Sequence, residues 1–496
     1  MEHHEQSYSY SSQGYYGRPQ AGMPSAASTA VPTPQRPGTP NDSAGGRNPF
    51  GDGVESQASQ RSGHGAGNPF TSPSVSRPAS SFDGSSSAGA RLDDRPQRYF
   101  HSRRVRKDEI EKPWMTKVDP KEKWVTILPL IGIFLGLAIS GFLVWDGIRS
   151  VVKHQYCQVL NEDWSNGINP DIWEAEVQVG GFGNGEFEQT TPANSENVYV
   201  EGGHLFIKAT LQKEEYMESD YYIDLLKDGT CTSTVPMDCI ARTNTTAGNS
   251  SVVPPTLSGR LTTKPGASIK YGRVEVTAKL PAGDWLWPAI WMMPVEETYG
   301  AWPRSGEIDL AESRGNNYTH PQGGNNIVSS ALHWGPDPAN DAFWRTNVKR
   351  PALHTTYSSK FHTFGVEWSQ KYLFTYIDSR LLQVLYTNFD SPLWNRGNFP
   401  SVDANNTRLD DIWSAKTGRY NTPFDQKFFL ILNVAVGGTN GWFEDNVNGK
   451  PWLNGSPNAK KDFWGSRGSW FPTWTQPQME VSKVQMWQQC DGNEDL

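Results

Sequence analysis

The sequence predicts an all-β domain, built as a two-sheet sandwich and preceded by a disordered tail and one transmembrane helix. Three observations lead to this prediction. Short runs of alternating apolar and polar residues, separated by turn residues, recur after residue 158. Seventeen of the twenty tryptophans follow residue 150, which places an aromatic core or binding surface there. One stretch of 22 residues, 124–145, carries no charge and is long enough to cross a bilayer.

Residues 1–100 are rich in Ser, Gly, Pro and Gln and contain no sustained apolar run. Such a segment cannot bury enough apolar surface to offset its conformational entropy, so we expect a disordered tail. The tripeptide Asn-Pro-Phe occurs twice in it, at Asn48–Phe50 and Asn68–Phe70. It resembles the endocytic sorting motif read by EH-type adaptor domains, and a chance match in a Pro-rich tail is the alternative.

The uncharged run 124–145 follows a basic juxtamembrane segment at 101–123. As a helix it would span about 33 Å, against a hydrocarbon core of about 30 Å. Trp124 and Trp145 would lie at the two membrane interfaces. The length, the flanks and the position in the chain disfavour a buried core helix or a cleaved signal peptide. Because Lys and Arg concentrate before the run, we expect a type II signal anchor with a cytosolic N-terminus.

After a stem at 146–157, the domain (158–490) and a short tail (491–496) are expected to be lumenal or extracellular, along the secretory pathway to the plasma membrane. All four cysteines lie beyond the membrane segment, which suits an oxidising compartment. Three pairings are possible; we favour Cys231–Cys239, which closes a short loop, and Cys157–Cys490, which ties the ends of the domain. The N-glycosylation acceptors of this part are Asn244, Asn249, Asn317, Asn405 and Asn454.

Strands are expected along the whole domain. Residues 272–280 alternate as a half-buried strand, and 362–368 with 372–378 form a hairpin. Residues 427–438 form a longer strand that ends at glycines, and 481–487 a closing strand. Residues 211–256 hold the short disulfide and two glycosylation acceptors, so we interpret them as an insertion into a single domain. The formal charge of -8 argues against nucleic acid as a partner.

The stretch 307–312 places Glu307, Asp309 and Glu312 among apolar residues. Glu307 and Asp309 share a strand face, whereas Glu312 is out of phase unless one residue, Ala311 or its neighbour, forms a β-bulge. The two glutamates would then lie about 13 Å apart at Cα, and their carboxyls could approach to roughly 5 Å. Retaining glycosidases need that separation. A solvated acidic patch and a calcium site are the alternatives, which the interleaved apolar residues and the regular strand disfavour.

The sequence SGEIDLAES, 305–313, resembles the Glu-x-Asp-x-x-Glu signature of glycoside hydrolase family 16, in its laminarinase (endo-1,3-β-glucanase) branch. The resemblance covers roughly 158–489 and implies a concanavalin A-like jelly-roll sandwich with a substrate cleft on its concave sheet. Other segments agree in order along the chain, with 258–264 and 271–281 resembling two paired strands. The remaining segments that match are 180–191, 285–294, 331–335 and 432–438.

This resemblance implies roles for particular residues. Glu307 would be the nucleophile, Glu312 the general acid/base and Asp309 their assistant, with His333 beside the acid/base. Trp291 is open between a sugar contact and the core. The candidate sugar-stacking rings are Trp287, Trp302 and Trp334, and the candidate hydroxyl-binding residues are Asn184, Glu186, Arg260 and Asn433. We expect no cofactor and no metal.

The layout of tail, span and domain resembles fungal type II membrane proteins associated with β-glucan synthesis, which implies a role in cell-wall assembly or remodelling. We therefore expect a membrane-anchored retaining glycosidase or transglycosylase that acts on β-1,3-linked glucan. The alternative is a non-catalytic glucan-binding scaffold. The region around the carboxylates is also similar to β-1,3-glucan recognition proteins. Those proteins often lack the catalytic glutamates, whereas this chain keeps both.

Overall fold

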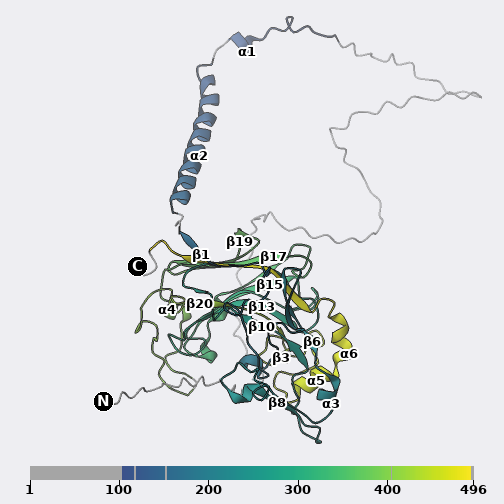
Figure 1. Ribbon diagram of the computed structural model, residues 1–496. Coiled ribbons are helices and arrows are strands. Elements are labelled where there is room, and N and C mark those ends of the chain that lie inside the picture. Colours follow the sequence, from purple (N-terminus) through teal and green to yellow (C-terminus); the bar gives the residue numbers. More distant parts are fainter. Residues whose placement is uncertain (1–102, 117–118, 151–153, 404, 493–496) are drawn as a thin grey trace, which may run out of the picture. The chain divides into compact units, whose positions relative to one another are not determined.

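The structure, a computed structural model, describes residues 103–116, 119–150, 154–403 and 405–492 (Figure 1). The expected disordered tail and both Asn-Pro-Phe tripeptides lie outside the described residues. The chain divides near residue 149 into two compact units, one ending at Ile148 and one continuing from Arg149 to the C-terminus.

The first unit is built around a long apolar helix. Helix α1, Pro113–Thr116, precedes α2, Glu122–Ser150, which has 29 residues and contains the whole uncharged run 124–145. Among the described residues this is the one helix long and apolar enough to cross a membrane, and its most apolar window is not buried against protein. These properties are consistent with a single-pass anchor.

Two eight-stranded antiparallel sheets form the body of the second unit and lie one above the other (Figure 1). The β12 sheet has the order β19-β18-β17-β12-β21-β5-β4, with β1 paired to β21. Its strands are β1 Tyr156–Glu162, β4 Val198–Glu201, β5 His204–Lys208, β12 Gly272–Lys279, β17 His362–Trp368, β18 Tyr372–Ile377, β19 Ser379–Asn388 and β21 Gln478–Gln489.

The β14 sheet has the order β16-β15-β14-β13-β20-β10-β2, with β11 paired to β20. Its strands are β2 Glu174–Ala175, β10 Arg260–Thr262, β11 Ser268–Ile269, β13 Leu286–Pro294, β14 Glu307–Ser313, β15 Ile327–His333, β16 Asn347–Pro351 and β20 Phe428–Val436. The two-sheet sandwich predicted from the alternating runs is therefore confirmed.

The core lies between the two sheets. In β12 the residues Val274, Val276 and Ala278 are fully buried and alternate with half-buried polar residues, as the sequence pattern predicts. The expected hairpin is β17–β18, and the closing strand is the longer β21. All nine residues of β20 are buried, because this strand lies in the middle of its sheet.

The expected pairing of 258–264 with 271–281 is wrong. Strand β10 lies in the β14 sheet, between β20 and β2, whereas β12 lies in the other sheet, between β17 and β21. The chain changes sheets between them: β11 still pairs with β20, and Gly272 then has φ +137°, which a residue with a side chain rarely adopts.

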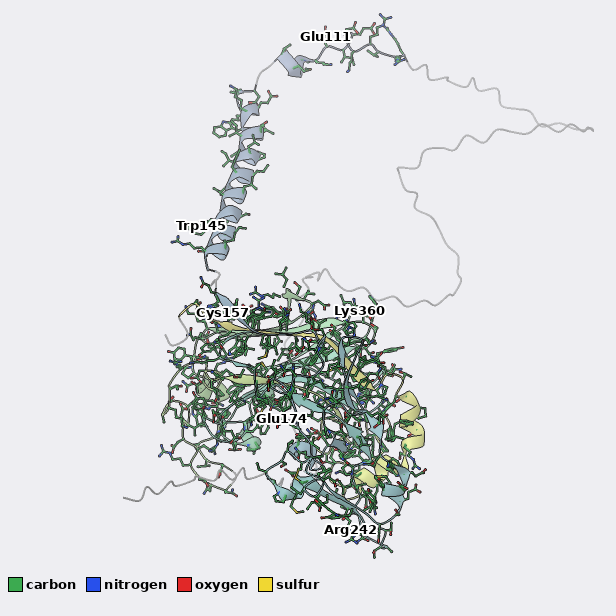
Figure 2. All side chains as sticks on the ribbon, in the orientation of Figure 1. Glu111, Trp145, Cys157, Glu174, Arg242 and Lys360 are labelled. Carbon is green, nitrogen blue, oxygen red and sulfur yellow. A yellow bond between two sulfur atoms is a disulfide. The ribbon has the colours of Figure 1, made fainter. Side chains whose placement is uncertain are left out.

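The insertion packs with neighbouring segments around a second, smaller apolar cluster. It contains the hairpin β7–β8 and contributes to the three-stranded sheet β3-β9-β6. Arg242, on β8, lies at the opposite end of the domain from Cys157 (Figure 2). The elements here are β3 Glu188–Thr190, β6 Thr210–Leu211, α3 Glu214–Glu218, β7 Tyr221–Asp224, η2 Pro236–Cys239, β8 Ile240–Thr243 and β9 Thr256–Ser258. The cluster consists of Val177, Val179, Met217, Ile223, Leu225, Cys239, Val253 and Trp464.

Short helical turns occupy the connections. They are η1 Gly181–Gly183, η3 Pro338–Asn340, η4 Phe343–Arg345, α4 Leu393–Gly397, α5 Ala459–Gly465, α6 Arg467–Trp470 and η5 Phe471–Thr473. Two disulfides close the domain: Cys157–Cys490 joins the start of β1 to the residue after β21, and Cys231–Cys239 closes a loop of the insertion. These are the two pairings that the sequence favours.

Candidate active site

The bulge expected in β14 is present. Opposite β13, Ile290 pairs with Ala311 and Trp291 pairs with Asp309, so Leu310 has no partner of its own. Opposite β15 the register also shifts between Asp309 and Glu312. This extra residue brings Glu312 into phase with the two preceding carboxylates.

The three carboxylates consequently share one face of the β14 sheet. Glu307 lies opposite His333, Asp309 opposite Ala331 and Glu312 opposite Ser329. The apolar residues between them, Ile308, Leu310 and Ala311, are at most 1% exposed and belong to the core. Asp309 is also only 1% exposed, whereas Glu307 and Glu312 are half-buried.

Each glutamate accepts a hydrogen bond from an indole. Trp302 Nε1 donates to Glu307 Oε2 over 2.7 Å, and Trp287 Nε1 donates to Glu312 Oε1 over 3.0 Å. Trp302 lies on the loop before β14, which is supported where Trp413 Nε1 donates to the Arg304 carbonyl. The two indoles orient the two carboxyl groups from opposite ends of the strand.

The surroundings of Glu312 place its ionisation near neutral pH. Burial raises the pKa of Glu312 to about 7, and the charge of Glu307 adds to that effect. His333, Trp287 and Arg314 act in the opposite direction, because each of them favours the carboxylate. Glu312 can therefore either hold or release a proton in the pH range where most proteins work.

His333 links Asp309 to a further carboxylate, Asp341. Its Nδ1 lies 2.5 Å from Asp341 Oδ2, and its Nε2 lies 3.3 Å from Asp309 Oδ2. The second contact has ion-pair distance but poor hydrogen-bond alignment, so Asp309 Oδ2 keeps no hydrogen-bond partner within the described chain. The imidazole is thus held between two acids.

This arrangement perturbs both groups. Burial raises the pKa of Asp309 well above its ordinary value, and the charges of Glu307 and Glu312 raise it further. Burial by itself would lower the pKa of His333, but Glu307, Asp309 and Asp341 together raise it well above 6.5. The surroundings therefore favour the protonated form of both Asp309 and His333.

Three of these residues could also hold a cation. Glu307, Asp309 and His333 each offer one ligand atom within 4.8 Å of the others, a spacing that a divalent ion could bridge. Two of the three are already engaged in the structure, because Trp302 donates to Glu307 and Asp341 orients His333.

A second group of side chains lies on the same face, toward β10. Arg260 pairs with Glu176, and its guanidinium lies 4.1 Å from the Phe182 ring and 4.8 Å from the Trp291 ring. Trp291 Nε1 donates to Asn433 Oδ1 over 2.8 Å. This group presents aromatic rings and a cation beside the carboxylates.

The loop after η1 adds two polar residues. Asn184 Nδ2 donates to Glu186 Oε1 over 2.9 Å, and Asn440 Nδ2 donates to Asn184 Oδ1 over 3.2 Å. Glu186 is 3% exposed, and its Oε2 has no hydrogen-bond partner within the described chain. An unsatisfied buried oxygen of this kind is suited to accept a hydrogen bond from a ligand.

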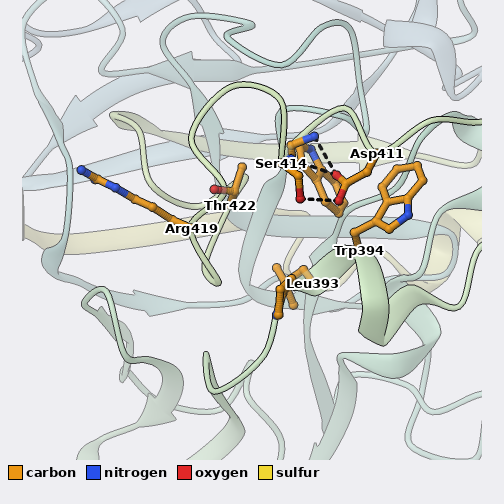
Figure 3. A pocket seen from close by; sticks show the side chains of 8 residues that line it. Leu393, Trp394, Asp411, Ser414, Arg419 and Thr422 are labelled. Carbon is orange, nitrogen blue, oxygen red and sulfur yellow. Dashed lines mark hydrogen bonds between the residues drawn. The ribbon is translucent and has the colours of Figure 1, made fainter.

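A small hollow elsewhere in the domain carries none of the carboxylates (Figure 3). Its one carboxylate is already engaged, since Asp411 accepts hydrogen bonds from Ser414 and from the Trp413 backbone. The candidate site is therefore the face of the β14 sheet. The lining of the hollow consists of Pro392, Leu393, Trp394, Asp411, Trp413, Ser414, Arg419 and Thr422.

Comparison with known proteins agrees with this geometry. Residues 233–426 match the family model described as glycosyl hydrolases family 16. A β-1,3-glucan-binding protein of Penaeus monodon is 37% identical over 366 residues, which cover 71% of this chain and 96% of that protein. The chain belongs to glycosyl hydrolase family 16.

Two further proteins are similar to this chain. A glucan endo-1,3-β-glucosidase of Cryptopygus antarcticus is 33% identical over 278 residues, which cover 56% of this chain and 79% of that protein. The laminarinase of Rhodothermus marinus, a solved structure, has a TM-score of 0.43 and 25% identity, and the match covers 68% of this chain and all of that one. The family model and the Penaeus monodon relative confirm the family-16 resemblance that the carboxylate signature indicates.

Two predicted stacking rings do not offer a free face. Trp334 is 0% exposed and packs against Phe399 and Trp413, so its assignment as a sugar platform is wrong. Trp334 follows the last residue of β15 and lies in the core, which the local sequence alone does not reveal. Trp287 is 8% exposed and stacks on Trp442 at 4.8 Å, so its visible role is to orient Glu312.

Trp302 and Trp291 remain half-exposed on the site face. The sequence left Trp291 open between a sugar contact and the core. Its position on the site face favours the sugar contact. Arg260 and Asn433 border this face through their contacts with Trp291, and Asn184 and Glu186 follow the turn that carries Phe182.

Some site residues were not predicted from the sequence. Asp341 orients His333, Phe182 covers Arg260, and Phe343 stacks on His333 with ring centroids 5.1 Å apart. All three lie in irregular connections, where no periodicity marks the direction of a side chain. The presence of Asp341 shortly after His333 in the sequence is a weak signal for this contact, because a buried histidine commonly needs a partner that orients its ring.

The expected glycosylation acceptors differ in accessibility. Asn317 and Asn405 are exposed, and Asn244 and Asn249 are half-buried in the insertion. Asn454 is disfavoured, because its amide already donates to the Phe443 carbonyl and its oxygen accepts from Lys450.

Proposed function

We propose that this chain is a retaining β-glucan glycosidase or transglycosylase acting on β-1,3-linked glucan. The observation that carries the proposal is the bulged strand β14, which presents Glu307, Asp309 and Glu312 on one face. The different surroundings of the two glutamates support different roles, since the pKa of Glu312 is raised to about 7 by burial.

In the first step Glu307 attacks the anomeric carbon and displaces the glycosidic oxygen. Glu312 gives its proton to that oxygen, so a glycosyl-enzyme ester forms while the leaving sugar departs as an alcohol. In the second step the ionised Glu312 takes a proton from water or from a sugar hydroxyl. The resulting oxygen attacks the anomeric carbon and releases Glu307, with overall retention of configuration.

The neighbouring residues support the roles of Glu307 as nucleophile and Glu312 as acid/base. Trp302 holds Glu307 through a bond to one oxygen and leaves the other oxygen for attack. His333 lies opposite Glu307, and its raised pKa favours the imidazolium form, which would stabilise the Glu307 carboxylate electrostatically. Trp287 holds Glu312 at the other end of the strand.

The substrate class is supported by the names of the relatives. One is called a glucan endo-1,3-β-glucosidase and another a β-1,3-glucan-binding protein. The second name also favours the other candidate function, a glucan-binding scaffold without turnover. Keeping all three carboxylates favours the enzyme, because a binding surface has no need of buried acids with raised pKa values.

We further propose that the chain is a type II membrane protein. It would be divided into tail 1–100, basic segment 101–123, span 124–145, stem 146–157, family-16 domain 158–490 and C-terminal tail 491–496. The apolar helix and the two disulfides support this layout. A role in fungal cell-wall assembly and an EH-type adaptor for the tail are parts of the same proposal.

The deciding experiment incubates the purified full-length chain, in detergent, with laminarin and separates the products by size. Shorter products indicate hydrolysis, longer ones indicate transfer, and binding without change indicates the scaffold. The matched controls are Glu307→Gln and Glu312→Gln, which keep the shape of each side chain and remove its charge. Equal turnover by the wild type and Glu307→Gln would contradict the proposal.

A further inference from the structure

A buried lysine that the proposed mechanism does not use lies in the long loop after β20. Residues 437–458 connect β20 to α5 and contain neither helix nor strand. Loops of this length without secondary structure are uncommon in a compact domain unless they carry a function. The side chain of Lys450, within this loop, is 0% exposed. A buried ammonium is costly unless it is fully paired, so its contacts show which parts of the loop it holds.

Lys450 uses all three of its ammonium protons inside the loop. Its Nζ donates to the Phe443 carbonyl over 2.9 Å, to Asp445 Oδ1 over 2.6 Å and to Asn454 Oδ1 over 2.5 Å. Asn454 Nδ2 in turn donates to the Phe443 carbonyl over 3.2 Å. Because a lysine ammonium has three donors, none of them is left unpaired. The side chain of Lys450 thus ties the two ends of segment 443–454 together.

The residue just before this segment, Trp442, contacts the side chain that orients the acid/base candidate. The rings of Trp442 and Trp287 stack with centroids 4.8 Å apart and an interplanar angle of 10°. Trp287 Nε1 donates to Glu312 Oε1 over 3.0 Å. The position of Trp442 therefore limits where the Trp287 indole can lie, and with it the direction of the hydrogen bond to Glu312.

Arg314 connects the same tryptophan to the catalytic strand. It follows Ser313, the last residue of β14, and is 7% exposed. Its Nη2 donates to the Trp442 carbonyl over 2.5 Å, and its guanidinium lies 4.1 Å from the Trp442 ring. Trp442 is thus held by a residue next to β14, while Lys450 fixes the loop that follows it.

We propose that Lys450 is a positioning residue for the acid/base Glu312, and that it acts through Trp442 and Trp287. Without the ammonium, three acceptors of the loop would lose their common donor and the loop would relax. Trp442 would then support Trp287 less firmly, and the Glu312 carboxyl would be less well aimed at the glycosidic oxygen. A displacement of about 1 Å can cost about a hundredfold in rate. The inference rests on the proposed function, because it names a support for the residue that donates the proton there.

The test uses the full-length chain and aryl β-glycosides of one laminari-oligosaccharide, which differ only in how good a leaving group the phenol is. Poorer leaving groups need more protonation by the acid, whereas the sugar part stays the same. In Lys450→Met we expect kcat/KM, which reports on formation of the glycosyl-enzyme, to fall about tenfold for the poorest leaving group and less than about twofold for the best. The matched control is Lys360→Met, at an exposed lysine, which should leave the whole series unchanged.

Equal losses for every leaving group would mean that Lys450 only stabilises the fold, and would overturn the inference. The double variant Lys450→Met/Trp442→Ala should lose no more than Trp442→Ala alone, because both changes act through one contact. Additive losses would contradict the route through Trp442. If Lys450→Met does not fold, Asn454→Ala removes one of the three acceptors and should give a smaller loss with the same dependence on the leaving group. No such dependence in Asn454→Ala would overturn the inference.

A spectroscopic readout separates this inference from the catalytic proposal. Hydrogen exchange at Trp287 Nε1 can be followed by NMR in a chain with isotope-labelled tryptophan, and its signal is assigned with Trp287→Phe. We expect faster exchange in Lys450→Met than in the wild type and in Lys360→Met. Faster exchange in a chain that cleaves no glycoside would support the contact and overturn catalysis. Unchanged exchange in an active chain would overturn the role of Lys450 and leave the catalytic proposal standing.

Discussion

Glu307 and Glu312 carry the same functional group in different surroundings. Glu312 is buried deeply enough for its pKa to rise to about 7, and it accepts a hydrogen bond from Trp287. Glu307 accepts a hydrogen bond from Trp302 and lies opposite His333, whose raised pKa favours the positively charged imidazolium form. The first environment suits a proton donor and the second suits an anion that attacks carbon.

Replacing Glu312 by Ala should affect substrates according to their leaving groups. Activated aryl glycosides need little protonation and should still form the glycosyl-enzyme, whereas laminarin should not be cleaved. Azide, which needs no general base, should restore turnover and give a β-glycosyl azide, measured by product NMR. Glu307→Ala should lose activity by many orders of magnitude on both substrates. An α-azide, or full activity of Glu312→Ala on laminarin, would contradict these roles.

The alkaline limit of activity should follow the ionisation of Glu312. Below about pH 7 this carboxyl is protonated and can act as the acid, and above it the proton is lost, so kcat/KM should fall. Trp287→Phe removes a donor that stabilises the ionised form, so the pKa of Glu312 and the alkaline limb should both move upward. Profiles of kcat/KM against pH for this variant and for Trp487→Phe, a control on the β12 sheet, provide the measurement. If the alkaline limb of the Trp287→Phe profile stays in place or moves to lower pH, Glu312 is not the group that limits activity at high pH.

The strands and their connections bring these residues together in one site, and the bulge in β14 is the clearest example. It supplies the one extra residue that puts Glu312 on the face of Glu307 and Asp309. The loop before β14 contributes Trp302, and the connection after β15 contributes Asp341 and Phe343. Regular strands therefore supply the acids, and irregular connections supply the groups that orient them.

Deleting Ala311 should remove the bulge and abolish activity in a folded protein. The residues after position 311 would shift by one relative to Ala289 and Ser329, and the carboxyl of Glu312 would move by several ångströms. A displacement of about 1 Å can already cost about a hundredfold in rate. The measurement is laminarin turnover, and circular dichroism checks that the variant is folded. The control is Ala311→Gly, which keeps the number of residues in the strand. Activity within about tenfold of the wild type would show that the bulge is dispensable.

The two disulfides should differ in their contribution to stability. Their cysteines are 333 and 8 residues apart in sequence. Loop entropy then assigns about 6 kcal/mol to Cys157–Cys490 and about 2.5 kcal/mol to Cys231–Cys239. We expect Cys157→Ser/Cys490→Ser to lower the thermal midpoint more than Cys231→Ser/Cys239→Ser does, as measured by calorimetry. The reverse order would mean that native contacts of the insertion outweigh the constraint on the unfolded chain.

At the scale of the whole molecule, the apolar helix and the disulfide-bonded domain bear on the membrane topology of the chain and on the compartment of its domain. Helix α2 has the length and composition of a membrane span, and both disulfides lie beyond it. An oxidising compartment on the C-terminal side agrees with the excess of Lys and Arg before the helix. An anchored glucan-active domain would act on polymer near the membrane surface.

The type II orientation predicts which parts are modified and which are protected. In sealed microsomes, added protease should remove the N-terminal tail and leave the domain intact. Treatment with a glycosidase that removes N-linked glycans should lower the apparent mass of the protected fragment. Asn317→Gln and Asn405→Gln, at the two exposed acceptors, should each reduce that shift, and Asn454→Gln should not. Protection of the N-terminal tail from the protease would indicate the opposite orientation.

The sequence by itself determined the class of the fold, the apolar helix and the catalytic signature. Alternation is a local property, so β12 could be predicted residue by residue. The β17–β18 hairpin and β20 could be predicted as short apolar runs bounded by turn residues or glycines. The phase of Glu312 is local as well, because a period of two cannot place it with Glu307 and Asp309 unless a bulge intervenes.

Only the tertiary structure decided what surrounds these residues. It moved β10 and β12 into different sheets, buried Trp334, covered Trp287 with Trp442, and brought Asp341 and Phe182 to the site. Each of these outcomes depends on contacts between segments far apart in the chain or on the path of an irregular connection. Local periodicity carries no information on either, because it specifies the face of a strand but not which segment packs against that face.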